Sequence, residues 1–224
     1  LKAEMMLDSM VLEARPDRKL FVTNRRGGIQ EIQAKALVFA GLFFEGAEAD
    51  GWLAKGLAIL GRELPEQILA DGGHFELSPM YHAIILEDLL DILNLARASG
   101  KGREPVIARL ADVTACMRTW LAAMTHPDGG PAFFNDCAFG IAATHAEIEG
   151  YAARLGLPPV VAPSAGLTLL ETSGYARIDA GPAVVILDVA AIGPDYIPGH
   201  AHADTLSFEL SLAGARIVVN GGTS

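Results

Sequence analysis

The chain has 224 residues, of which 51% are hydrophobic and 20% are charged. This composition excludes a disordered protein, and the apolar runs are far shorter than the ~20 residues that a membrane-spanning helix needs. Lys and Arg total 17 against 27 Asp and Glu, which gives a formal net charge of −10. The acidic balance argues against a nucleic-acid partner and against broad binding to anionic membranes, and the short apolar runs argue against membrane insertion.

The region 34–156 has the apolar periodicity of helices. Its apolar residues recur at spacings of three and four, and Gly-rich turns at 71–73 and 127–131 separate the groups. The pattern predicts helices of three to five turns that pair as antiparallel hairpins, as in bundles or toroids. The groups are Leu37–Phe43, Trp52–Leu60, Ile84–Leu93 and Val106–Leu121.

One predicted helix starts in a cluster of polar residues, 71–82. Ser78 followed by Pro79 is typical of an N-cap and first turn, so a helix is expected from Pro79 to about Ala98, with Tyr81 in its first turn. A helix N-terminus with a cation nearby favours a phenolate, which makes Tyr81 a candidate for proton transfer. The alternative is that Tyr81 packs on the apolar stripe of this helix.

Other residues near this helix start are further candidates. His74 or His82 is expected to be the cation beside Tyr81, and Glu76 is either a site residue or an acid that begins the helix. Asn135, in a later loop between helices, is either a substrate contact or a turn residue.

Beyond a linker at 157–166, the periodicity falls from 3.6 to 2 and predicts β-structure over 167–224. Turn residues at 181–182 and 213–214 separate the expected strands. The strand candidates are Gly174–Asp179, Ala183–Ala190, Thr205–Leu212 and Ala215–Asn220.

A second polar cluster precedes the third of these strands. His200 and His202, two residues apart on an extended segment, point the same way and can hold one metal ion, or divide between a metal and a proton. Asp204 is a third ligand or orients a histidine, and Asn220 is a weak oxygen ligand. The alternative is a surface loop with two solvated histidines.

Three motifs taken in order resemble the heparinase II/III-like family of polysaccharide lyases: DGGHFELSPMYH, FFNDCAFG, and GHAHADTLSFEL followed by VVNGGTS. The resemblance extends from about Ala34 to Ser224 and leaves 1–33 as an atypical N-terminal segment. It implies an α+β multidomain fold, in which an incomplete (α/α) toroid of helical hairpins precedes the first strands of an antiparallel β-sandwich. We expect the chain to be a fragment of a longer protein.

The resemblance also implies a reaction, a substrate and a location. Family members cleave uronate-containing polysaccharides, such as heparan sulfate or alginate, by β-elimination, so an acidic polysaccharide or oligosaccharide is the expected partner. The periplasm or cell envelope is the expected location. An Asn-His pair that neutralises the uronate carboxylate in many members has no counterpart here, where Gly27 and Gly28 stand. Arg25 or Arg26 is a weaker source of positive charge.

The resemblance assigns roles to the polar clusters. Tyr81 and His200 match the catalytic residues, and His74, Glu76, His82 and Asn135 are expected to bind the substrate. His202 matches a ligand of a structural zinc, with Asn220 at the position of a further ligand; zinc is the only cofactor expected.

Two other functions compete with the lyase. One is a metal-dependent hydrolase that uses the two histidines, although such enzymes usually carry them at the end of an early barrel strand. The other is a non-catalytic carbohydrate-binding protein, which would display exposed aromatic side chains.

Overall fold

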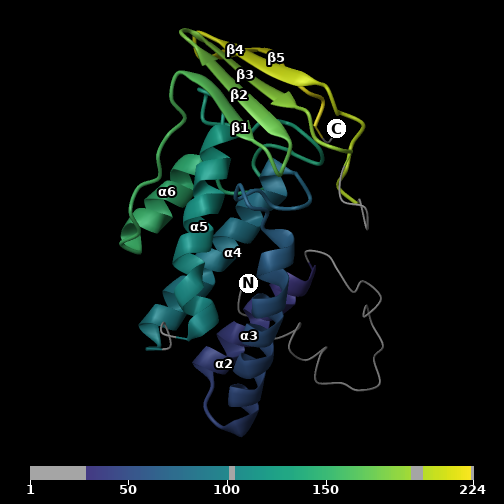
Figure 1. Cartoon of the computed structure of the whole chain (residues 1–224). Coiled ribbons are helices and arrows are strands. Elements are labelled where there is room, and N and C mark those ends of the chain that lie inside the picture. The colour runs from purple at the N-terminus through teal and green to yellow at the C-terminus, as the bar shows by residue number, and fades with distance from the viewer. Residues whose placement is uncertain (1–28, 101–103, 193–198, 223–224) are drawn as a thin grey trace. The chain divides into compact units, whose positions relative to one another are not determined.

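A computed structural model describes residues 29–100, 104–192 and 199–222. Helices and strands occupy successive parts of the chain, as predicted (Figure 1). The helices are α2 (Ile29–Phe43), α3 (Ala47–Gln67), α4 (Pro79–Ala98), α5 (Pro105–Ala123) and α6 (His145–Arg154). None of the helices among the described residues combines the length and the apolar character needed to cross a bilayer. The chain divides into two compact units, Leu1–Leu64 with Asp91–Ala108, and Pro65–Leu90 with Arg109–Ser224.

Close helix packing characterises the first unit. Gly56 of α3 lies so near α2 that a Cβ there would stand 2.8 Å from a methyl carbon of Val38. Gly41 leaves similar room for Leu53, because an added Cβ would stand 2.5 Å from the Leu53 backbone nitrogen. An ion pair of 2.6 Å joins Lys35 of α2 to Asp91 of α4. Small residues therefore set the distance between α2 and α3.

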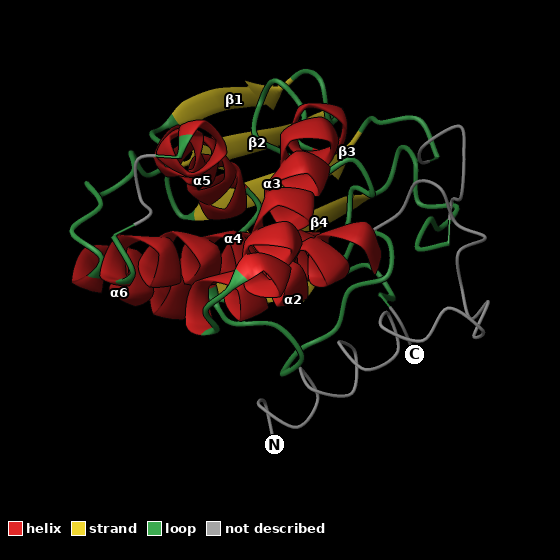
Figure 2. Ribbon diagram, turned by 90° about the horizontal axis from the view of Figure 1, so that it is seen from below, coloured by secondary structure: helices red, strands yellow, loops and turns green. Residues whose placement is uncertain are grey.

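The second unit contains a five-stranded antiparallel sheet in which each strand pairs with the next along the chain (Figure 1, and in part Figure 2). The strands are β1 (Gly166–Leu170), β2 (Tyr175–Ala180), β3 (Ala183–Asp188), β4 (Phe208–Leu212) and β5 (Ala215–Val218). The last four confirm the predicted strands: β2 is shifted by one residue, and β3, β4 and β5 are shorter than predicted. β1 was not predicted, because it begins at the end of the segment that was assigned to a linker.

One face of the sheet packs on helix α5, near the C-terminal end of that helix (Figure 1). Trp120 is fully buried there and forms a core with Tyr175 of β2 and Ile186 of β3. The Arg118 guanidinium of α5 makes two bonds to the Glu149 carboxylate of α6 and donates a third, of 3.0 Å, to the Pro158 carbonyl. These contacts join the sheet, α5 and α6 within the second unit.

The opposite face of the sheet is apolar and open. Strand register places Ile178 of β2 beside Val185 of β3, and Leu187 of β3 beside Phe208 of β4. Many large side chains in and around the sheet are exposed, among them Leu167, Leu169, Ile178, Phe208, Leu212 and Ile217. Sheets with one apolar face of this kind pack against a second layer in β-sandwiches.

Candidate active site

Helix α4 begins as the Ser78-Pro79 pair predicts. The backbone N–H of Tyr81 points to the Ser78 hydroxyl at 3.4 Å, and the N–H of His82 donates to the Ser78 carbonyl at 2.9 Å. Leu77, just before the cap, has a φ of 60°, a strained value for a side chain of this size. The cap therefore fixes Tyr81 in the first turn, where its side chain is partly exposed.

The structure brings Tyr81 and His200 together. Their ring centres lie 3.8 Å apart, with 31° between the ring planes. The two residues come from the helical part of the chain and from the segment before β4, and the His200 side chain is 30% exposed. A molecule in solution can thus reach a phenol and an imidazole that are in contact.

Asp136 completes this cluster. Its carboxylate Oδ2 lies 3.0 Å from Nδ1 of His200, and its backbone N–H donates to the His200 carbonyl, also at 3.0 Å. Its own carbonyl accepts a bond of 2.8 Å from the hydroxyl of Ser78. Asp136 thus bonds both to the segment of His200 and to the cap of the helix that carries Tyr81.

The electrostatics around Tyr81 favour its neutral phenol. Burial raises the pKa of Tyr81, and the nearby carboxylates of Asp136 and Glu76 raise it further. The sequence led us to expect a cation beside this ring that would favour the phenolate. The charged groups that act on the pKa of Tyr81 are carboxylates instead, so the electrostatics suit Tyr81 as a proton donor.

His74 and His82 do not supply that cation, because both side chains are completely buried. Burial lowers the pKa of His74 to about 3 and that of His82 to about 4, so both rings are neutral near pH 7. His82 accepts a bond from the His74 backbone N–H through Nδ1, lies 2.9 Å from the Met117 carbonyl through Nε2, and stacks on Trp120. These contacts give His82 a structural role.

Glu76 and His74 lie at the edge of the cluster. The Glu76 side chain is 10% exposed, and its Oε2 is 3.9 Å from Nδ1 of His74, a distance too long for a hydrogen bond. Nε2 of His74 lies 3.3 Å from the Gln67 amide oxygen. The roles of Glu76 and His74 in substrate binding stay predictions.

Two glycines allow the turn at 71–73 to pack closely against α5 and the loop between β1 and β2. Gly72 has a φ of +90°, and a Cβ there would collide with the Cys116 carbonyl. A Cβ on Gly73 would lie 2.7 Å from the indole nitrogen of Trp120. Asp71 anchors the turn, since its Oδ2 accepts bonds of 2.7 Å and 2.9 Å from the backbone N–H and the hydroxyl of Ser173.

Asn135 is a buried connecting residue rather than an open substrate contact, and it is only 2% exposed. Its amide group donates to the Leu77 carbonyl at 3.0 Å and to the Tyr175 hydroxyl at 3.1 Å. Its amide oxygen accepts a bond of 3.0 Å from the backbone N–H of His202. Its backbone N–H donates to the Asp204 carboxylate at 2.6 Å. Asn135 thereby holds the loop before α4 against the segment that carries His200 and His202.

We expect Asn135→Ala to lower the free energy of unfolding by about 2 to 4 kcal/mol. The change removes three side-chain hydrogen bonds, and it leaves the partly buried N–H of His202 without its acceptor. Asn135 also has a φ of 54°, which costs roughly 1 kcal/mol more for Ala. Urea unfolding of the chain measures the difference.

Asn135→Gly is the matched control, because glycine loses the same bonds without the backbone strain. Its stability should lie between those of Asn135→Ala and the wild type. If neither variant loses stability, Asn135 does not hold these segments together.

The side chain of Asn220, the expected further zinc ligand, takes part in hydrogen bonds. The Asn220 amide group donates to the Ser207 hydroxyl at 3.1 Å, and its oxygen accepts from the Gly221 N–H at 2.7 Å. No group of three His, Cys, Asp or Glu side chains suited to a metal occurs within residues 29–100, 104–192 and 199–222. Zinc binding through His202 and Asn220 stays a prediction.

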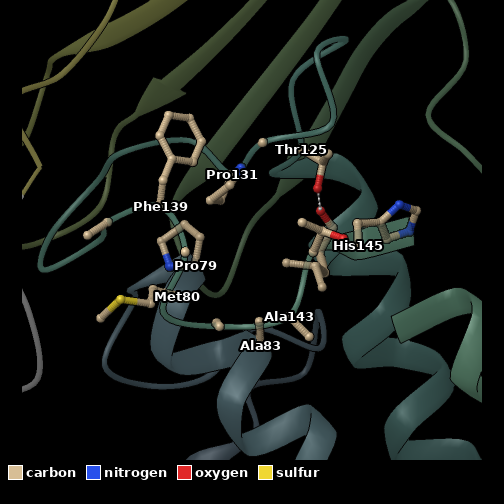
Figure 3. A pocket seen from close by; sticks show the side chains of 14 residues that line it. Pro79, Met80, Ala83, Thr125, Pro131, Phe139, Ala143 and His145 are labelled. Atoms are coloured by element: carbon tan, nitrogen blue, oxygen red, sulfur yellow. Dashed lines mark hydrogen bonds between the residues drawn. The ribbon is translucent and has the colours of Figure 1, made fainter. Parts of the chain in front are cut away.

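A small cavity lies beside the start of α4 (Figure 3). Its volume is about 50 Å³, and apolar side chains such as Met80, Ala83 and Phe139 line much of it. This volume has room for one or two water molecules and not for a sugar ring. Neither Tyr81 nor His200 lines this cavity, so it is separate from the cluster.

Sequence reasoning missed Asp136 as a member of the site. It offered Asp204 as a third metal ligand or as the residue that orients a histidine, and the Asp204 carboxylate accepts bonds from the Asn135 N–H and the Asn220 amide. The motif FFNDCAFG contained Asp136, and a histidine with a catalytic role usually has a carboxylate or carbonyl partner. The residues alone could not show which carboxylate reaches His200. The basic pair Arg25 and Arg26 lies outside the described residues.

Two family models match the chain. One, described as heparinase II/III N-terminus, matches residues 13–153, and the other, described as heparinase II/III-like C-terminal, matches residues 162–224. The first match starts upstream of Ala34, where we had placed the beginning of the resemblance.

Curated relatives include a heparin-sulfate lyase of Bacteroides stercoris, 31% identical over 118 residues, which are 52% of this chain and 18% of that protein. A heparin-sulfate lyase of Bacteroides thetaiotaomicron is 40% identical over 74 residues, 33% of this chain and 10% of that protein. The matched segments span less than a fifth of the length of these relatives.

Solved structures resemble the chain over nearly its whole length. Heparinase III matches with a TM-score of 0.77 at 23% identity, covering 99% of this chain and 38% of that one. Heparan sulfate lyase HepC from Pedobacter heparinus matches with a TM-score of 0.71 at 21% identity, covering 99% and 36%. These matches confirm the predicted fold class over the part of those structures that the chain covers. With both family models matched in order, the chain belongs to the heparinase II/III family.

Proposed function

We propose that the protein carrying this chain is a polysaccharide lyase that cleaves an acidic glycosaminoglycan of the heparan sulfate type by β-elimination. The contact between Tyr81 and His200, with ring centres 3.8 Å apart, carries the proposal. The names of the curated relatives support heparan sulfate over alginate as the substrate class. The periplasm or cell envelope remains the proposed location.

The reaction needs one group that takes a proton and one that gives a proton. In our proposal, His200 removes the proton from C5 of the uronate, next to the carboxylate. The electron pair of that C–H bond forms the C4–C5 double bond as the bond from C4 to the glycosidic oxygen breaks. Tyr81 donates its phenolic proton to the departing oxygen.

The surroundings of each group support this division. The raised pKa of Tyr81 keeps its proton available for donation. The partly exposed His200 can meet a substrate, whereas the buried rings of His74 and His82 cannot without movement of the chain. Return of a proton from His200 to Tyr81 then resets the site.

The product tests the reaction class. We expect the full-length protein that carries this chain to release oligosaccharides with strong ultraviolet absorbance from heparan sulfate, because the new double bond is conjugated with the carboxylate. Reducing ends that form without this absorbance would indicate hydrolysis. Retention on the polymer with no cleavage would indicate a binding protein.

Two histidine variants serve as a matched pair. His200→Ala should abolish the absorbing product, while His145→Ala should retain it, because His145 is a partly exposed histidine at the start of α6 whose ring faces the Glu149 carboxylate of the same helix. Equal loss in both variants would point to a general effect on folding.

A further inference from the structure

We propose that Asp136 is the positioning residue that fixes both the orientation of His200 and the nitrogen that carries its proton, so that Nε2 is the atom that exchanges a proton with the substrate. That this partner is a substrate rests on the proposed function. The contacts between Asp136 and His200 do not depend on that function. No sequence motif assigned Asp136 a role.

The first argument is the chemistry of the contact. A carboxylate only accepts hydrogen bonds, so Oδ2 of Asp136 at 3.0 Å requires a proton on Nδ1 of His200. In the neutral imidazole the lone pair then lies on Nε2. Without this partner the ring could carry its proton on either nitrogen, and only one of the two forms presents a base at Nε2.

The second argument is that Asp136 is itself held on both sides. Asp136 makes two bonds to His200. The Asp136 N–H donates to the His200 carbonyl, and the Asp136 carboxylate contacts the His200 ring. Its carbonyl accepts the Ser78 hydroxyl, and Ser78 caps the helix of Tyr81. Any shift of Asp136 therefore moves His200 relative to Tyr81.

The third argument concerns the support behind the loop. Asn135, the preceding residue, is buried and binds Leu77, Tyr175, His202 and Asp204. An exposed ion pair on a mobile loop contributes little to orientation. The carboxylate of Asp136 instead projects from a backbone that is fixed on its N-terminal side, so its position is set before a substrate arrives.

Asp136→Asn tests the inference, because it keeps the size of the side chain and the backbone bonds. The amide can donate to Nδ1, which moves the proton of the neutral ring to Nε2 and removes the base. Long-range ¹H–¹⁵N spectra of the 224-residue chain at alkaline pH should show a protonated Nδ1 in the wild type and a protonated Nε2 in the variant.

Activity of the full-length protein gives the second readout. For Asp136→Asn we expect kcat to fall at least ~10-fold, as for other residues that orient a functional histidine, with KM changed by less than about threefold. Asp136→Glu keeps the carboxylate and should recover part of kcat and the protonated Nδ1. A merely structural residue would not produce this split between kcat and KM or the change of tautomer.

The outcomes separate this inference from the proposed function. An unchanged tautomer in Asp136→Asn, or full kcat in that variant, would overturn the positioning role. A changed tautomer in a protein whose wild type releases no unsaturated product would support the positioning role and overturn the lyase proposal instead.

Discussion

Replacing Tyr81 with Phe is expected to lower the turnover of the full-length protein at least ~100-fold, the lower end of what a positioned proton donor contributes. The variant keeps the ring that lies 3.8 Å from the ring of His200, so substrate access and packing are preserved. Only the phenolic O–H is lost, and no other hydroxyl in this cluster takes its place: that of Ser78 is already bonded to the Asp136 carbonyl.

Stability provides the control for this variant. The free energy of unfolding should change by less than ~1.5 kcal/mol, the range of volume-conserving swaps. Initial rates and urea unfolding measure the two effects separately. A fully active Tyr81→Phe variant would leave His200 as the only catalytic candidate, and an unfolded variant would assign Tyr81 to packing.

The buried histidines are expected to make the fold sensitive to acid. The pKa of His82 falls from 6.5 to about 4 on folding, because burial disfavours the charged ring. Below pH 6.5 the His82 ring therefore binds a proton in the unfolded chain but not in the folded chain, and the free energy of unfolding declines as the pH falls toward 4. At ~1.4 kcal/mol for each pKa unit, His82 alone accounts for up to about 3 kcal/mol.

His74 acts in the same direction, and Asp188 acts in the opposite one. Burial, with the neighbouring Asp204 carboxylate, raises the pKa of Asp188 to about 6, so this group stabilises the fold as the pH falls from 6 toward 4. The informative quantity is therefore the difference between wild type and His82→Gln, measured by urea unfolding at pH 7 and at pH 4.5.

The cost of His82→Gln should be largest at pH 7 and should shrink by about 2 to 3 kcal/mol at pH 4.5, because Gln has no proton to bind. Asp71 is the charged group that raises the pKa of His82 slightly, and it stays in place in both proteins. A cost that is the same at both pH values would show that His82 is not held neutral by burial.

The sequence predicted the elements that local signals specify. Ser78 and Pro79 gave the correct start of α4, and alternation of apolar residues gave β2 to β5. It failed for β1, because this strand begins at the end of a Pro-rich stretch, 157–166, that was assigned to a linker.

The contacts of the site depend on tertiary structure, and this is where the prediction was incomplete. Asp136 and His200 are 64 residues apart, and no local pattern links them. The burial of His74 and His82 was equally hidden, since histidine is common on surfaces and in cores alike. Asn135 looked like a turn residue or a substrate contact, and its positive φ agrees with the turn, while its four partners could be found only in the folded chain.

The close fit of Gly72 and Gly73 against Cys116 and Trp120 has a consequence for how relatives are classified. Larger residues are excluded at these two positions because they would collide with their neighbours, and not because the glycines take part in proton transfer. A relative that had lost its catalytic activity would therefore still need both glycines to fold. The glycine pair therefore reports ancestry. The catalytic activity of a relative is better judged from Tyr81, Asp136 and His200 together, because substitution of these three leaves the packing of the glycine turn unchanged.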